Sequence, residues 1–139
     1  MGAAGPVEAE VIAYLESQIG DGYSEPGRLY LRFSSQSFTC ADPHDELACG
    51  HHWEVSLQIP AEFLGPGVYA LADSPIVATA NSTGGGDVCE KGGGAVSGTL
   101  EIDAVDDGSV TGRLCHLRAF VLEEQILLDG MFVAPRCPQ

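Results

Sequence analysis

Basic residues are scarce in this chain of 139 residues. The sequence contains six Lys and Arg residues and twenty Asp and Glu residues, which gives a formal net charge of −14 at pH 7. A surface of that sign repels phosphate backbones and anionic lipid head groups, so we expect no nucleic-acid partner. The charge serves solubility in the simplest interpretation, and the alternative is attraction of cations, either metal ions or basic partner surfaces.

Long apolar runs are also missing. No segment approaches the roughly 20 apolar residues of a membrane-spanning helix, so we expect no direct membrane insertion by this chain. Residues 1–6 carry neither the basic region nor the apolar run of a secretory signal, and this absence does not argue for the cytoplasm. We expect residues 1–6 to be a disordered remnant and residues 7–139 to form a single β domain, a length that suits one core.

Three motifs of common enzymes are absent. The chain contains no G-x-S-x-G elbow, no G-x-G-x-x-G in a βαβ setting and no Walker A lysine. Serines, histidines and acids are present, but nothing in their spacing brings them within hydrogen-bond reach of one another. We therefore predict no catalytic residue and favour a non-enzymatic protein. A hydrolase whose site has a histidine beside a serine or carboxylate is an alternative.

The cysteines lack the C-x-x-C spacing of zinc ribbons and thioredoxin-type sites. Their surroundings are mostly loops or a terminus, which suits disulfides in an oxidising, extracytoplasmic compartment: the periplasm, the cell surface or the medium. We predict disulfides Cys40–Cys49 and Cys89–Cys137, with Cys115 as a buried free thiol. A Cys89–Cys115 pair with Cys137 free, or an intermolecular bond that makes a homodimer, are the alternatives.

Apolar residues alternate with polar ones along much of the chain, and sustained helical periodicity is absent. The pattern predicts an all-β protein, an antiparallel β-sandwich or small β-barrel of about eight short strands held by disulfides. The first expected strand, Val7–Leu15, also fits the apolar face of a helix. The expected strands are Val7–Leu15, Arg28–Phe38, Trp53–Ile59, Val68–Leu71, Ile76–Ala80, Ser97–Val105, Val110–Leu122 and Ile126–Val133.

Three segments add detail to this expectation. Residues 81–94 contain two triple-glycine runs, and we expect a loop there. In the strand from residue 97 we expect Leu100, Ile102 and Ala104 to face inward. The acids of Asp106-Asp107-Gly108 fit a hairpin turn rather than a calcium site, because the EF-hand spacing is missing.

Histidines cluster between residues 44 and 52, next to several carboxylates. Imidazoles and carboxylates bind zinc or copper when three or four converge. Adjacent histidines on a strand point to opposite faces, so His44 could be joined by either His51 or His52, and by His116 only if its strand passes nearby. The spacing matches no standard zinc signature, and a polar, solvated loop is the simpler interpretation. The acids concerned are Asp42, Asp45 and Glu46.

Several pieces, taken in order, resemble the uncharacterised secreted or lipid-anchored β-domain proteins of myxobacterial type. They are Phe33-Ser34-Ser35 leading to Cys40-Ala41-Asp42-Pro43, Cys49-Gly50-His51-His52-Trp53, Pro66-Gly67-Val68-Tyr69-Ala70-Leu71, Gly98-Thr99-Leu100-Glu101-Ile102, and Asp129-Gly130-Met131-Phe132-Val133-Ala134 before Arg136-Cys137. This resemblance implies an exported β-sandwich, tethered by an acylated cysteine upstream, and it implies no particular activity or functional residue.

Together these observations predict an exported, non-enzymatic domain at the cell surface or in the periplasm. It would bind a protein or a glycan, or play a structural role. A metal-binding module that uses His44 with His51 or His52 is the first alternative, and an unrecognised hydrolase is the second.

Overall fold

The computed structural model describes residues 9–15, 28–42, 46–60, 65–72, 75–85, 89–121 and 124–137. Every regular element in these ranges is a β-strand. The strands are β1 (Glu10–Leu15), β2 (Leu29–Ser34), β3 (Trp53–Ile59), β4 (Gly67–Ala70), β5 (Val77–Thr83), β6 (Lys91–Gly94), β7 (Val96–Val105), β8 (Ser109–Val121) and β9 (Glu124–Pro135). Among the described residues, no helix is long and apolar enough to cross a membrane.

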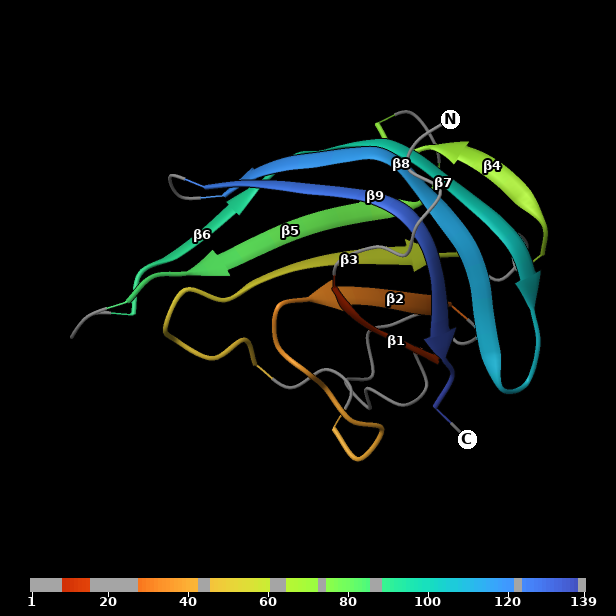
Figure 1. Ribbon diagram of the computed structural model, residues 1–139, viewed down its shortest axis with the longest axis horizontal. Helices are drawn as coiled ribbons and strands as arrows, with labels where there is room; N and C mark the ends of the chain where they lie inside the picture. Colours follow the sequence, from red (N-terminus) through yellow and green to blue (C-terminus); the bar gives the residue numbers. More distant parts are fainter. Residues whose placement is uncertain are drawn as a thin grey trace.

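Two antiparallel sheets pack face to face, which confirms the predicted β-sandwich. One sheet has five strands in the order β1-β2-β3-β5-β6, and the other has four in the order β4-β7-β8-β9. Figure 1 shows the long strands β8 and β9 arching over the five-stranded sheet. The first segment is therefore a strand and not a helix, and β1 pairs with β2 along its whole length.

Alternation along the strands builds the core, because every second side chain points between the sheets. In β3 the side chains of Val55, Leu57 and Ile59 are fully buried, as the sequence pattern predicts. Phe33 of one sheet and Phe132 of the other meet edge to face, with ring centroids 5.2 Å apart. The side chains that alternate with these buried ones along β2 and β3, such as Arg32, consequently lie on the outer face of the five-stranded sheet.

The glycine-rich segment differs from its expectation as a loop. Strand β5 continues to Thr83, and β6 pairs with it from Lys91 to Gly94. Glycine has no side chain to alternate, so a strand made of it leaves no pattern in the sequence. The small size is also required in space: a Cβ on Gly94 would lie 1.7 Å from the carbonyl oxygen of Phe120 on β8. Glycine thus lets β6 pass against the other sheet before it leads into β7 (Figure 1).

One inward position was predicted wrongly. Leu100 and Ile102 are buried, but Ala104 is exposed. The pairing of β7 with β8 shifts register between Ile102 and Ala104, and such an irregularity reverses the alternation beyond it. Simple period-two reasoning cannot show where that shift occurs.

The predicted disulfide pairing is also wrong, although the four cysteines are the expected ones. Cys40 bonds to Cys137, and Cys49 bonds to Cys89. Strand pairing explains why the cysteines have other partners than predicted. The chain end reaches β1, where the Cys137 amide donates to the carbonyl of Ala13 at 2.8 Å, and Cys137 packs in a small apolar cluster with β1 residues and Phe38, close to Cys40 in sequence.

The second bridge follows from the pairing of β3 with β5. Cys49 lies just before β3 and Cys89 lies beyond the end of β5. The backbone of the two connections is joined as well, because the Gly50 amide donates to the carbonyl of Gly84 at 3.0 Å. Cys115 on β8 is a free thiol, and its burial raises its pKa. It is therefore not placed at the surface, as an intermolecular bond would require.

Candidate functional site

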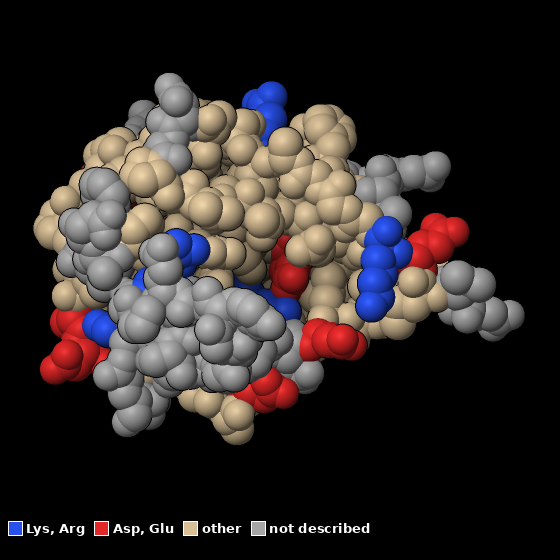
Figure 2. Space-filling model, turned by 180° about the vertical axis from the view of Figure 1, so that it is seen from behind, with Lys and Arg blue, Asp and Glu red and all other residues tan. Residues whose placement is uncertain are grey.

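A hollow of about 430 Å³ opens on the outer face of the five-stranded sheet. Figure 2 shows this side of the molecule, with a basic and an acidic side chain deep in a recess of the surface. The described residues that line the hollow, here called the outer-face pocket, are Arg32, Glu46, Leu47, Glu54, Asn81, Ser82, Thr83, Lys91, Gly92 and Gly93.

An ion pair forms the floor of the outer-face pocket. The Arg32 Nε donates to Glu54 Oε2 at 2.7 Å, and the Arg32 Nη2 contacts the same oxygen. Register places the two side chains diagonally, because Arg32 lies opposite Ser56 and Glu54 lies opposite Ser34. The Arg32 side chain is only 5% exposed and that of Glu54 is 13% exposed. Removing one partner would leave a charge without compensation in a largely buried place, at a cost of about 3–5 kcal/mol.

Phe38 stacks on the guanidinium group of Arg32. Its ring centroid lies 3.4 Å from the guanidinium carbon of Arg32, which is a cation–π contact. Phe38 in turn packs against the cluster of Ile12, Tyr14 and Cys137. The Cys40–Cys137 bridge lies beside this cluster, so the floor of the pocket is held by packing, an ion pair and a covalent link together.

The next strands extend the polar floor toward the sheet edge. Asn81 on β5 lies directly opposite Glu54, and its Nδ2 donates to Glu54 Oε1 at 3.4 Å. On its other side Asn81 faces Gly93 of the edge strand β6. The side chain of Lys91, at the start of β6, is exposed, and the hydrogen bonds and ion pairs between side chains of described residues do not include it. The pocket therefore offers both hydrogen-bond donors and acceptors to a ligand.

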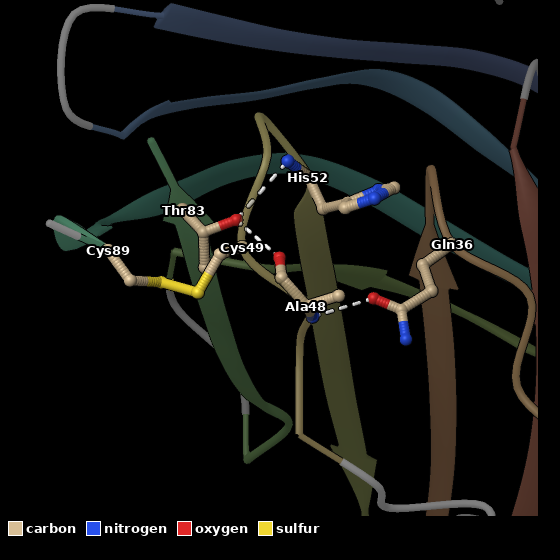
Figure 3. The surroundings of a disulfide bond; sticks show 6 residues. All are labelled: Gln36, Ala48, Cys49, His52, Thr83 and Cys89. Atoms are coloured by element: carbon tan, nitrogen blue, oxygen red, sulfur yellow. Dashed lines mark hydrogen bonds between the residues drawn. A yellow bond between two sulfur atoms is a disulfide. The ribbon is translucent and has the colours of Figure 1, made fainter. Parts of the chain in front are cut away.

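Thr83 fixes the segment that carries Glu46 and Leu47. Its Oγ1 donates to the carbonyl of Ala48 at 2.6 Å and accepts from the amide of His52 at 3.3 Å. Gln36 Oε1 accepts from the amide of Ala48 at 2.8 Å. Figure 3 shows these contacts beside the Cys49–Cys89 disulfide, which links the same segment to the residues just before β6.

Among the described residues, the histidines predicted to bind a metal do not converge on one site. His44 lies outside the described residues. His51 is exposed in a turn with φ 66°, and its ring lies against Gly85, where a Cβ would be 2.6 Å from Nε2. His52 directs its Nδ1 to Ser35 Oγ at 3.2 Å. No group of three or more His, Cys, Asp or Glu able to hold a metal occurs among the described residues.

His116 does not join the other histidines and instead contacts Asp129 on the neighbouring strand. It sits in a left-handed conformation with φ 53° at the register shift of β8, on the four-stranded sheet. Its amide donates to Asp129 Oδ1 at 3.3 Å, and its Nδ1 lies 3.7 Å from Asp129 Oδ2. His116 and Asp129 thus form a local pair of neighbouring strands.

Ser35 and His52 are the one histidine–serine pair that the described residues bring together. Ser35 Oγ also accepts from the amide of Trp53 at 3.1 Å, so the serine links the end of β2 to the start of β3. Within the described residues no carboxylate contacts His52, and neither Ser35 nor His52 lines the outer-face pocket. Among the described residues, the pair is therefore joined by neither the orienting acid nor the cleft that a hydrolase site combines with a serine and a histidine.

Sequence reasoning did not identify Arg32 and Glu54. Each occupies the polar position of an alternating strand, and this pattern is typical of a side chain that faces solvent. The one available signal was Arg32 between Leu31 and Phe33, in a chain with few basic residues. No protein family, no curated protein and no solved structure matches the chain.

Proposed function

We propose that this protein is an exported, non-enzymatic binding domain, located in the periplasm, at the cell surface or in the medium, and that the outer-face pocket is its binding site. Two disulfides suggest an oxidising, extracytoplasmic environment. The resemblance to secreted or lipid-anchored β-domains supports the same location.

The observation that carries the binding role is the Arg32–Glu54 pair at the floor of an open hollow. A buried ion pair contributes little net stability, since apolar residues of the same volume often stabilise as well or better. Its charged groups are nevertheless held in fixed positions by Phe38 and Asn81. Preorganised polar groups in a concave site are what a specific ligand requires.

A binding screen by nuclear magnetic resonance tests this function. Uniformly labelled protein is titrated with mixtures of saccharides, amino acids, dipeptides and nucleosides. We expect at least one mixture to shift the backbone amides around Glu54, Asn81 and Lys91. The double variant Arg32→Met/Glu54→Leu removes both charges together and should abolish these shifts while the protein stays folded. Arg118→Met, on the exposed face of the other sheet, is the control.

Shifts confined to other surfaces, or shifts that persist in the double variant, would contradict the assignment of the pocket. Location has its own test, thiol trapping in the organism of origin. We expect four oxidised cysteines and one thiol, and a fully reduced protein would argue against export.

A further inference from the structure

We propose that the ligand of the outer-face pocket is an uncharged saccharide unit, bound through hydroxyl groups to the side chains of Glu54, Asn81 and Lys91. This inference rests on the proposed function, which assigns the pocket as a binding site, and adds the chemistry of its ligand.

Charge balance is the first argument. The described lining residues carry two basic groups, Arg32 and Lys91, and two acidic groups, Glu46 and Glu54. Arg32 and Glu54 already neutralise each other at the floor. The described lining residues therefore offer an ionised ligand no net opposite charge, and an anion would also approach against the field of a chain with net charge −14.

The pattern of hydrogen-bonding groups is the second argument. Lys91 Nζ and Asn81 Nδ2 are donors, whereas Glu54 and Asn81 Oδ1 provide acceptors. Glu54 and Asn81 lie opposite each other on β3 and β5, and Lys91 lies on the adjacent strand β6, two residues before the partner of Asn81. Donors and acceptors thus come from three neighbouring strands. A hydroxyl group both donates and accepts, and a sugar carries several such groups on neighbouring carbons. Leu47 is the one large apolar side chain among the described lining residues, so an apolar ligand finds little contact.

The shape of the rim is the third argument. At about 430 Å³ the hollow lies in the lower part of the range for ligand sites, roughly 300–1,000 Å³. Gly92 and Gly93 border it on the edge strand β6 and add no side chain beyond that of Lys91. A Cβ on Gly93 would come within 3.3 Å of Asn81 Oδ1. Glycine at this position therefore keeps the Asn81 amide open to a ring that rests against the strand.

Titration with named probes tests the inference. The neutral probes are maltose, cellobiose, lactose and N,N′-diacetylchitobiose, and the charged probes are glucuronate, glucosamine and alanyl-alanine. We expect at least one neutral probe to shift the pocket amides with a dissociation constant that does not change with salt. Charged probes should bind about tenfold more weakly or not at all.

A matched pair of variants locates the contact. Asn81→Ala should weaken binding of the neutral probe about tenfold or more. Thr79→Ala changes an exposed residue two positions earlier on the same face of β5, outside the pocket, and should leave binding unchanged. Both positions are exposed, so both variants should fold.

The outcomes separate the two proposals. If a charged probe occupies the pocket and the neutral ones do not, the inference is wrong and the binding function stands. Equal losses in Asn81→Ala and Thr79→Ala would also overturn the inference. If no saccharide shifts the pocket amides, the inference fails, and the wider screen decides separately whether the pocket binds anything.

Discussion

Two buried serines differ in how their hydroxyl groups are satisfied. Ser34 Oγ donates to the carbonyl of Trp53 at 2.7 Å and accepts from the amide of Gln36 at 3.0 Å. Ser82 Oγ is equally buried and has no hydrogen-bond partner in the described part of the chain. A buried hydroxyl without a partner is destabilising, whereas a bonded one contributes net stability.

The variants Ser34→Ala and Ser82→Ala should therefore act in different directions. We expect Ser34→Ala to lower the free energy of unfolding by about 1–3 kcal/mol, because two partners lose their bonds. Ser82→Ala should leave it unchanged or raise it by about 1 kcal/mol. Urea denaturation of the two variants measures both values. A large loss of stability in Ser82→Ala would show that its hydroxyl has a partner after all.

The identity of the site residues was the part that sequence could not supply. Alternation correctly places Arg32 and Glu54 on the outer face of the sheet. Whether an outward charge stays in water depends on what lies over it, and here Phe38 and the segment of Glu46 and Leu47 come from loops. No local pattern encodes the position of those loops.

Single elements show the same division between pattern and context. Trp53–Ile59 was predicted with its true bounds, because its alternation is complete and Pro60 follows it. Strand β6 was missed, because glycine carries no hydrophobic pattern. The inward position of Ala104 failed at a shift in register that depends on β8. Strands with alternating apolar and polar side chains can be predicted from the sequence. Strands and register shifts that depend on how the backbone packs against its neighbours cannot.

The close approach of β6 to β8 leads to a prediction. Gly94→Ala would place a Cβ 1.7 Å from the carbonyl oxygen of Phe120, so the backbone must move. We expect a loss of about 1–3 kcal/mol or more in the free energy of unfolding, measured by chemical denaturation. Gly65→Ala, where a Cβ would meet nothing within 4 Å, is the control and should change stability by no more than about 0.5–1 kcal/mol. Equal effects of the two variants would contradict the described crossing.

The turn between β7 and β8 should respond to pH. Asp106 Oδ1 accepts from the amides of Gly108 and Ser109, both at 2.8 Å, and these bonds lower the pKa of Asp106 below its ordinary value of 3.8. Because the pKa of Asp106 is lower in the folded protein than in the unfolded chain, ionisation of Asp106 stabilises the fold when the pH is above the pKa of the unfolded chain. This contribution disappears as the pH falls through the pKa of the folded protein.

Asp106→Asn keeps an oxygen that can accept the same bonds but does not titrate. Unfolding free energies measured from pH 6 down to acid should show the wild type more stable than Asp106→Asn at the upper end. The difference should shrink once pH falls below the ordinary value of 3.8. Asp107→Asn, in the same turn and without a side-chain hydrogen bond to the described residues, should follow the wild type. A difference that does not depend on pH would refute the role of ionisation.

For the molecule as a whole, the disulfides close loops of 97 and 40 residues. Loop-closure entropy predicts that loss of the longer bridge costs about 5 kcal/mol and loss of the shorter about 4 kcal/mol. The paired variants Cys40→Ala/Cys137→Ala and Cys49→Ala/Cys89→Ala test this by denaturant unfolding, with Cys115→Ala as the control. Peptide mapping under nonreducing conditions should find these two bridges, and a Cys40–Cys49 peptide would contradict the fold's connectivity.

That connectivity also dictates how the protein must mature. Cys40 and Cys49 are nine positions apart, so in an unfolded chain they collide far more often than either meets its final partner. Oxidation before folding would first trap this neighbouring pair, which the finished molecule never contains. Escape requires exchange by a thiolate, and Cys115 is withdrawn from solvent once the sheets close. Production of protein with the correct disulfides should therefore depend on a disulfide isomerase or a glutathione redox buffer.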